Sequence, residues 1–380
     1  DPKYFSIQNK NIKKEISDFI NEAFTKEALR LDDYLIKLDN NPEKLTFNKF
    51  SDDEDRFIKK INNAFKELLE NKKVLFIGED ILDPYGGAFK VSKGLSSLYP
   101  ERVIGTPISE ALIAGVSNGL ALNGFVPFAE FMFGDFTSLA FDQLLNHSSK
   151  IYNMYNKQIT CPVVFRTPMG GGRGYGPTHS QTLEKHFLGM DTFEICATNR
   201  FVNPKLVLEY ALKREHPTLI VENKVDYGKN GKMNIPDGYE ALVSSENLPS
   251  ILVAPKINKA TTTIITYGGL ADLVINNIYE FFYEHDKLVQ VLILTKIDPI
   301  PEKILKHSLE NSKNIIFVEE GISGGSVGDY FISWIAQNFQ NKNLKTISSK
   351  RISIPSTKTL EQEILPNKNI ITNSLNYMSE

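Results

Sequence analysis

The 380-residue chain carries 43 Lys and Arg side chains against 46 Asp and Glu side chains, for a formal net charge of −3. This balance gives no indication of nucleic acid or an anionic membrane as a partner, and the length allows two domains with sizeable cores plus an extension. Without a signal peptide or an apolar run of membrane-spanning length, we expect a soluble protein of the cytoplasm or, after processing, of an organelle matrix.

Residues 1–60 are expected to form a helical arm. An apolar residue recurs at every fourth position among charges, at Ile12, Ile16, Ile20 and Phe24. This spacing predicts one apolar stripe on a helix. After a polar stretch, Ser51 or Asp52 is placed to cap a second helix, whose apolar residues also share one face. Such thin stripes cannot bury themselves, so we expect the arm to lie on the body or on a partner.

Residues 61–240 alternate between apolar runs and helical patterns. Six short runs are typical of strands buried in a parallel sheet, and they begin at Lys73, Arg102, Val126, Pro162, Phe193 and Thr218. Helical patterns at 137–156 and 203–215 lie between them, which predicts an α/β domain with helices on both faces. The stretch 226–250 lacks periodicity and is interpreted as the connection out of this domain.

Residues 255–380 repeat the alternation on a smaller scale. Strands are predicted at 261–267, 289–295 and 314–320, and helices at 268–285, 301–310 and 324–339. A final helix and tail are expected after about residue 353. The pair Gly268–Gly269 lacks the GxGxxG spacing, so it gives only a weak signal for a dinucleotide site.

The stretch 104–136 contains a carboxylate that needs an explanation. Thr106 and Pro107 indicate a helix start, because proline is tolerated in the first turn, and Gly124 is a typical helix end. Glu110 therefore falls in the first turn of a nearly all-apolar helix. Taken alone, Glu110 is readily explained as a complement to the helix dipole, a contribution of roughly 0.3–1 kcal/mol.

Four stretches together change that interpretation. They are GEDILDPYGGAFKVSKGL (78–95), TPISEALIAGVSNGLALNG (106–124), FAEFMFGDFTSLAFDQLLN (128–146) and GGGRGYGPTHSQTLEKHF (170–187). Over about residues 73–353 the chain resembles the beta subunit of the thiamine-diphosphate-dependent decarboxylating component of 2-oxoacid dehydrogenase complexes of the pyruvate, branched-chain and acetoin types. The resemblance implies an α/β, thiamine-diphosphate-binding fold. A parallel-sheet pyrimidine domain would be followed by a transketolase C-terminal-like α/β domain, with the helical arm in front.

The resemblance also implies cofactor-binding residues. Glu110 matches the family's glutamate, which hydrogen-bonds the aminopyrimidine ring of thiamine diphosphate and thereby activates the cofactor. Phe136 matches the residue that stacks on the pyrimidine, while Met132 and Ile108 match its apolar surroundings. Glu79 directly follows a predicted strand, where it is either a further carboxylate at the cofactor, near Glu110, or a turn cap.

His179 is the second expected catalytic residue. It follows a run of glycines too flexible for regular structure, which indicates a loop whose backbone approaches a neighbour closely. The resemblance places this histidine at the mouth of the active site, near the bound 2-oxoacid. A histidine that merely holds a surface loop is the alternative interpretation.

The chain contains no Gly-Asp-Gly motif, which thiamine diphosphate enzymes use to hold the diphosphate and Mg²⁺. In the family the alpha subunit holds Mg²⁺ and the diphosphate, so no metal ligand is expected here. The first helix resembles the closing helix of the alpha subunit. The expected partners are therefore an alpha subunit or a fused alpha domain, a second copy of this chain, the lipoyl acyltransferase core and the 2-oxoacid. Three aromatic residues of the 324–339 helix are expected at the dimer interface: Tyr330, Phe331 and Trp334.

The activity implied is oxidative decarboxylation of a 2-oxoacid, with transfer of the acyl unit to a lipoyl group. The alternatives are a transketolase-like or deoxyxylulose-phosphate-synthase-like thiamine enzyme, and a non-catalytic homologue kept for assembly. The motifs TPISE (106–110), FDQ (141–143) and GPTHSQ (176–181) argue against the first alternative. Intact Glu110, Phe136 and His179 argue against the second.

Overall fold

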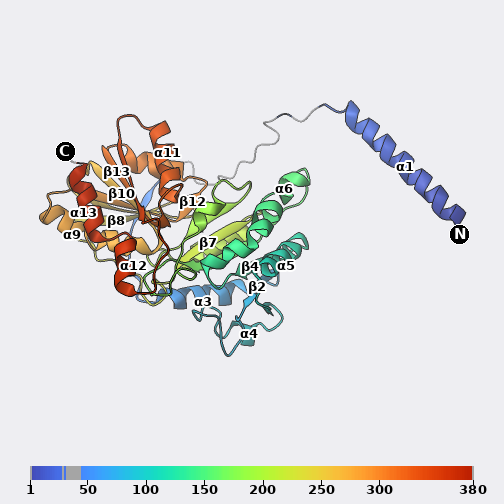
Figure 1. Cartoon of the computed structure of the whole chain (residues 1–380), viewed down its shortest axis with the longest axis horizontal. Coiled ribbons are helices and arrows are strands. Elements are labelled where there is room, and N and C mark those ends of the chain that lie inside the picture. The colour runs from blue at the N-terminus through green and yellow to red at the C-terminus, as the bar shows by residue number, and fades with distance from the viewer. Residues whose placement is uncertain (1, 28–29, 31–43, 379–380) are drawn as a thin grey trace. The chain divides into compact units, whose positions relative to one another are not determined.

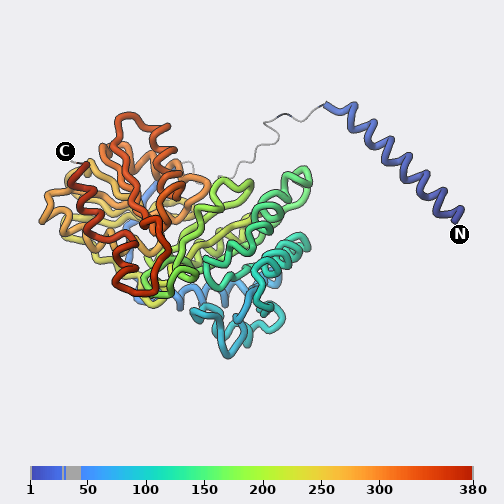
Figure 2. Tube along the Cα trace, viewed as in Figure 1, coloured from blue at the N-terminus to red at the C-terminus, as the bar shows by residue number. Residues whose placement is uncertain are grey.

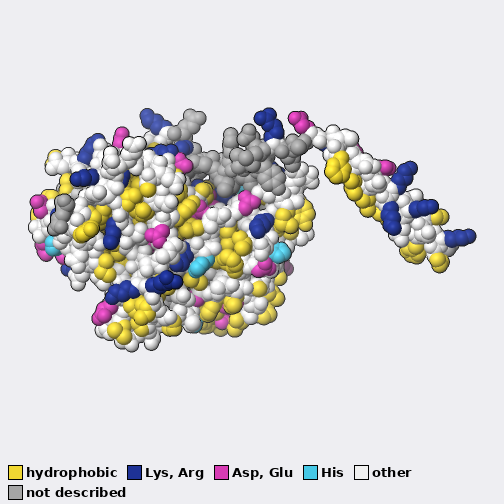
Figure 3. Space-filling view, turned by 45° about the horizontal axis from the view of Figure 1, so that its top comes forward, with side chains coloured by type: hydrophobic (Ala, Val, Ile, Leu, Met, Phe, Trp, Pro, Cys, Tyr) yellow, Lys and Arg dark blue, Asp and Glu magenta, His cyan; other side chains and the backbone are white. Residues whose placement is uncertain are grey.

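The computed structural model describes residues 2–27, 30 and 44–378 (Figures 1 and 2). The chain divides into two units, residues 1–39 and 40–380. In the first unit, α1 (Pro2–Thr25) carries the predicted apolar stripe, and none of its described residues is buried. These apolar side chains are visible along the helix in Figure 3. No helix among the described residues is long and apolar enough to cross a membrane.

The first sheet of the second unit has the strand order β12–β6–β7–β5–β4–β2–β3. Its strands are β2 (Val74–Glu79), β3 (Val103–Thr106), β4 (Val126–Glu130), β5 (Val164–Met169), β6 (Glu194–Ala197), β7 (Thr218–Asn223) and β12 (Lys296–Asp298). Strands β2 to β7 pair in parallel, as predicted, while β12 adds an antiparallel edge to β6. All residues of β2, β5, β6 and β7 are buried, because both faces of this sheet are covered.

The second sheet has the order β1–β8–β9–β11–β10–β13–β14. Its strands are β1 (Phe47–Lys49), β8 (Tyr239–Ser244), β9 (Ile251–Pro255), β10 (Thr262–Tyr267), β11 (Val289–Leu294), β13 (Asn314–Ile322) and β14 (Asn343–Ser349). The strands β11, β10, β13 and β14 are parallel, whereas β1, β8 and β9 extend the sheet in antiparallel fashion. The sheet is therefore mixed, and its parallel half corresponds to the predicted small α/β domain.

Helices flank both sheets. The α-helices of the second unit are α3 (Phe57–Leu68), α4 (Leu95–Leu98), α5 (Glu110–Leu122), α6 (Ile151–Met154), α7 (Pro204–Lys213), α8 (Ala271–Ile275), α9 (Ile278–Tyr283), α10 (Glu302–Leu309), α11 (Val327–Asn338), α12 (Lys358–Ile364) and α13 (Lys368–Tyr377). Helices α3 and α7 pack on each other, α5 packs on β4, and α11 packs on β13 and β14. The shorter turns are η1 (Gly134–Ala140), η2 (Gln143–Ser148), η3 (Glu184–Phe187) and η4 (Gly268–Leu270).

Several local predictions were wrong. The helix after β3 begins at Glu110 with Ser109 as its N-cap, not at Thr106. Helix α3 has no side-chain cap, so neither Ser51 nor Asp52 has the predicted role. The stretch 137–156 is broken into a 3₁₀ turn, a π turn and a short α-helix. The stretch 226–250 is not only a connection, since it contains β8.

Two strands cross the expected domain limits. Strand β1, from the expected arm, joins the second sheet, and β12, from the expected C-terminal domain, joins the first. The boundaries 1–60, 61–240 and 255–380 therefore stay a prediction. The aromatic side chains of α11 are also largely used within the chain. Phe331 is fully buried against Phe317, and the Tyr330 hydroxyl donates to Asp298 Oδ1 at 2.8 Å.

Candidate active site

The predicted site residues gather at the carboxyl ends of parallel strands, which share one edge of the first sheet. Glu79 is the last residue of β2, and its register partner is Thr106, the last residue of β3. Glu110 begins the helix that follows β3. On the other side, β5 leads into the glycine-rich loop and β7 leads directly into Lys224.

Glu110 and Glu79 form a buried pair of carboxylates. Glu110 is only 4% exposed at the start of α5, and Glu79 is 3% exposed. Burial raises the pKa of Glu79, and the negative charges of Glu110, Asp80 and Glu130 add to the rise, which brings the pKa to about 7. Among the described residues, nothing donates a hydrogen bond to Glu79 Oε2. The charge of Glu110 acts on the pKa of Glu79, so the two carboxylates lie near each other. The role of Glu79 at a cofactor stays a prediction, and its Oε2 is a buried acceptor.

An ion-pair network that the sequence analysis missed lies on the neighbouring strands. Arg166 of β5 is 1% exposed, and its guanidinium bonds to Glu130 of β4 and to both oxygens of Glu222 of β7, at 3.0 and 2.5 Å for the latter. The Tyr227 hydroxyl also donates to Glu222 Oε2, at 2.6 Å. A fully buried guanidinium needs such partners, because an unpaired charge in the interior is very costly. The sequence signal that could have indicated this network is the single charged residue within each of the apolar strands β4, β5 and β7.

The structure brings Phe136 and His179 together. Their ring centroids are 5.2 Å apart at an interplanar angle of 82°, and Phe133 packs edge-on against both, at 5.9 and 4.7 Å. The Phe136 ring is carried by η1, and both rings are partly exposed. These three side chains form an accessible aromatic surface, which we call the Phe–His platform.

Met132 and Ile108 are not part of this aromatic surface. Met132 is partly buried and precedes the platform residue Phe133. Ile108 is 77% exposed, two residues before Glu110. An apolar side chain this exposed beside a buried carboxylate leaves room for a ligand or a partner chain to cover it.

The glycine-rich loop is fixed to the C-terminal part of the chain. Glu361 of α12 accepts hydrogen bonds from the backbone of Gly172 and Gly174, at 2.9 and 3.0 Å. At Gly174, φ is +70° and a Cβ atom would lie 2.9 Å from the carbonyl oxygen of Ser356. The predicted close approach of backbone to a neighbour is therefore confirmed, and the neighbour belongs to the chain itself.

Lys224 is a further buried charge that the sequence analysis missed. Lys224 directly follows β7, and Glu79 is the last residue of β2. A charged residue at the carboxyl end of a predicted parallel strand is the sequence signal that could have identified both. Its Nζ donates to the carbonyl oxygen of His179 at 2.5 Å. Beside the platform, a cavity of about 490 Å³ is lined by Asp135, Thr137, Ser138, Phe141, Gln181, Leu183, His186 and Phe187.

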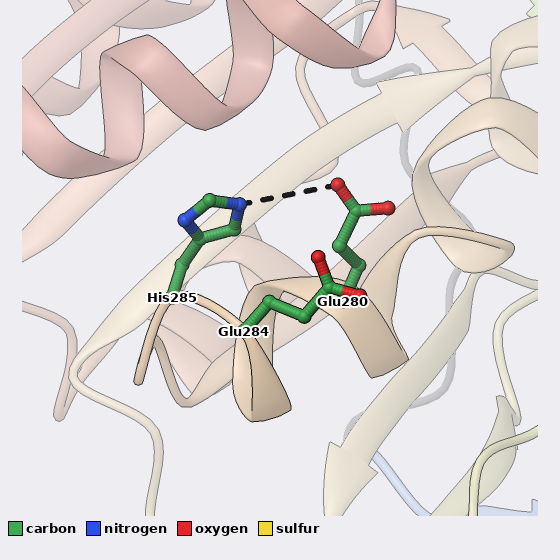
Figure 4. Close-up of side chains that lie close together, drawn as sticks. All are labelled: Glu280, Glu284 and His285. Atoms are coloured by element: carbon green, nitrogen blue, oxygen red, sulfur yellow. Dashed lines mark ion pairs between the residues drawn. The ribbon is translucent and has the colours of Figure 1, made fainter.

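Another cluster, far along the chain, has metal-binding residue types. Glu280, Glu284 and His285 lie close together around the end of α9 (Figure 4). Lys368 Nζ already pairs with Glu280 at 2.9 Å, and His285 lies 3.9 Å from the same carboxylate. With Glu280 neutralised by a lysine and Glu284 exposed, we assign no metal to this cluster.

The comparisons with known proteins agree with this geometry. The family described as the pyrimidine-binding domain of transketolase matches residues 56–229. The chain is 28% identical over 302 residues to the pyruvate dehydrogenase E1 component subunit beta of Staurastrum punctulatum, which covers 78% of this chain and 89% of the relative. It is 29% identical over 311 residues to the mitochondrial subunit beta-1 of the pyruvate dehydrogenase E1 component of Arabidopsis thaliana. This match covers 80% of this chain and 84% of the relative.

A solved structure described as a split gene transketolase, inactive beta4 tetramer, has a similar fold. Its TM-score is 0.65 at 15% identity, over 84% of this chain and 97% of that one. The chain thus has an α/β fold of the thiamine-diphosphate type, and residues 56–229 match a transketolase-type pyrimidine-binding domain. Within this class, the similarities support a beta subunit of the decarboxylating E1 component of 2-oxoacid dehydrogenase complexes.

Proposed function

We propose that this chain is the pyrimidine-binding half of a 2-oxoacid dehydrogenase decarboxylase. The reaction is oxidative decarboxylation of a 2-oxoacid, and the acyl unit passes to a lipoyl group of an acyltransferase core. The observation that carries the proposal is the buried Glu110 at the start of α5, with Glu79 beside it and the Phe–His platform at the same sheet edge.

The residues present fit an aminopyrimidine ring. Such a ring offers N–H donors, and Glu79 Oε2 is a buried acceptor that no described residue satisfies. Glu110 would share a proton with a ring nitrogen, which requires a desolvated and well-positioned carboxyl group. Phe136, Met132 and Ile108 would provide the apolar surface against which the ring packs.

Thiamine diphosphate, when bound, supplies the carbon nucleophile that attacks the keto group and the electron sink that allows CO₂ to leave. The chain's own contribution is to orient the ring, to hold a proton at Glu110 and to exclude water. His179 would donate or accept a proton near the substrate, because an imidazole changes protonation near neutral pH.

The chain would be active only with an alpha part. Because it lacks a Gly-Asp-Gly motif, we propose that an alpha subunit or a fused alpha domain holds the diphosphate and Mg²⁺. We further propose self-association into a dimer and binding to a lipoyl acyltransferase core. The cytoplasm or an organelle matrix would suit this role, and the Arabidopsis relative named above is called mitochondrial.

One observation favours a second candidate. The solved structure of similar fold is described as an inactive tetramer of a split transketolase, so a transketolase-like activity or a non-catalytic assembly role is the alternative. Co-purification with an alpha chain, followed by an assay of CO₂ release from 2-oxoacids and from ketose phosphates, separates them. We expect CO₂ release from a 2-oxoacid only with both chains and thiamine diphosphate present. Ketose cleavage, or no turnover with any alpha chain, would contradict the proposal.

A further inference from the structure

Lys224 is a buried cation with an unusual set of neighbours. Its side chain is 0% exposed at the carboxyl end of β7. No carboxylate of the described residues lies within ion-pair distance of its ammonium group, and the hydrogen bond that it donates goes to the neutral carbonyl oxygen of His179. A buried ammonium group without an ion-pair partner lowers the stability of the fold. Packing therefore does not explain why a lysine occupies position 224, and a functional role does.

The second neighbour of Lys224 is the Phe–His platform. Its Nζ lies 5.3 Å from the ring centroid of Phe133, within the range of a cation–π contact. Phe133 is the ring that packs against both His179 and Phe136. Lys224 thus contacts the backbone of His179 and the ring that supports its imidazole.

The segment that follows His179 is held by Asp135. Gln181 donates to Asp135 Oδ1 from its backbone nitrogen at 3.3 Å and from its side chain at 2.8 Å. Two buried charged residues, Lys224 and Asp135, therefore hold the chain at His179 and Gln181. The imidazole itself is oriented by a contact of 3.0 Å between Nδ1 and Thr178 Oγ1, which leaves Nε2 as its other polar atom.

We propose that Lys224 is a positioning residue for His179. Its ammonium group fixes the His179 carbonyl and the face of Phe133, and so sets the direction in which the imidazole points toward the 2-oxoacid. This inference rests on the proposed function for its catalytic consequence, but not for its structural one.

The charges around Lys224 support this role. Burial lowers the pKa of Lys224 to about 8, a shift that Asp135, Glu320 and Glu361 oppose and Arg173 reinforces. Arg173, in the glycine-rich loop, donates to the carbonyl oxygen of Lys224 at 2.6 Å. Lys224 therefore contacts both ends of the segment 173–179, through its backbone carbonyl at Arg173 and through its side chain at His179. Loss of the side chain should keep the first contact and loosen the His179 end of the segment.

The test compares three variants of the full chain, assembled with an alpha partner. Lys224→Met keeps the length but removes the donor, Lys224→Gln keeps a donor without charge, and Lys229→Met is the matched control. Lys229 lies five residues on and pairs with Asp272 at 2.6 Å, away from His179. We expect Lys224→Met to lower kcat about 10- to 100-fold, the loss that corresponds to one charge-assisted hydrogen bond, with the cofactor Kd within about threefold of wild type. Lys224→Gln should recover part of the rate.

A second readout needs no activity. Arg173 is exposed six residues before His179, so trypsin cleavage after Arg173 reports how tightly the segment 173–179 is held at its His179 end. We expect faster cleavage in Lys224→Met than in Lys229→Met at equal Tm. An unchanged kcat in Lys224→Met, or equal losses in both Met variants, would overturn the inference. If the wild-type assembly releases no CO₂, the proposed function fails, and unchanged cleavage in Lys224→Met would then overturn the positioning role separately.

Discussion

Phe136 and His179 lie in edge-to-face contact, with ring centroids 5.2 Å apart, although one is carried by η1 and the other by the segment after the glycine-rich loop. The contact places an apolar wall and a titratable imidazole on one surface. Both residues also lie near the sheet edge that holds Glu110. The carboxylate, the apolar wall and the imidazole that the proposed function requires are thus presented by one chain, and each can be tested alone.

Glu110→Gln should abolish decarboxylation without unfolding the chain. The amide keeps the size of the side chain and most of its hydrogen bonding, but it cannot share a proton with the ring nitrogen. We expect kcat to fall at least about 100-fold in the assembly with an alpha partner. Glu284→Gln, at an exposed glutamate at the end of α9, is the matched control and should keep wild-type turnover. Turnover of Glu110→Gln within threefold of wild type would remove Glu110 from the mechanism.

Glu79→Gln should stabilise the chain at pH 8 but not at pH 5. The pKa of Glu79 is raised from 4.5 to about 7 in the folded state, so the folded chain binds more protons than the unfolded chain between these values. Stability contributed by the protonated form is present below pH 4.5 and is lost as the pH rises through 7. Glutamine resembles the protonated form at every pH. Thermal unfolding at both pH values measures the difference, with Glu101→Gln on the surface as the control. A higher Tm only at pH 5 would contradict the prediction.

Part of this site could be predicted from the sequence, because its residues lie in continuous motifs. Glu110 and Phe136 belong to two adjoining stretches that carry the family resemblance, which implies their roles, and His179 is marked by its glycines. Arg166 and Lys224 could not be paired in advance. Their partners come from other strands, and only the order of the parallel sheet decides which strand ends meet.

The same reason explains the errors in the fold. The parallel strands of the first sheet have a strong apolar signal because most of their residues are buried. Strand β8 is only half-buried and lies in a segment rich in turn residues, so its signal is weak. Strand β12 is three residues long, and its place in the first sheet depends on β6, about a hundred residues earlier in the chain.

Arg166→Met should destabilise the fold strongly. The change leaves Glu130 and Glu222 as buried carboxylates without their shared cation. Breaking a buried ion pair by removing one partner costs about 3–5 kcal/mol, whereas replacing all members by neutral groups costs far less. Denaturant unfolding should therefore show a large loss for Arg166→Met. The triple change Arg166→Met, Glu130→Gln, Glu222→Gln should recover at least half of that loss, and no recovery would assign the loss to packing alone.

Phe136→Ala should weaken thiamine diphosphate binding while leaving the fold intact. Stacking on an aromatic ring contributes about 0.5–1.5 kcal/mol beyond burial, so we expect Kd to rise roughly tenfold in the assembled protein. Phe282→Ala is the matched control, since Phe282 is also partly buried but lies on α9. Calorimetry measures both. Equal cofactor affinity in the two variants would show that Phe136 does not contact the pyrimidine.

The last prediction concerns α1. Its exposed apolar side chains include Phe5, Phe19 and Phe24, at 67%, 75% and 86% exposure. A single helix in water takes most of its stability from packing, so a stripe of this kind should be covered in the assembly. Deleting residues 1–43 should leave the Tm of the remaining chain unchanged but weaken association with the alpha partner at least about tenfold, because a buried aromatic anchor typically contributes that much to an interface. Sedimentation velocity of the mixture, with a Lys13→Ala and Lys14→Ala variant on the same helix as the control, measures the effect. If the truncated chain assembles as tightly as the full one, α1 does not bind the alpha partner, while the assignment of the active site is unaffected.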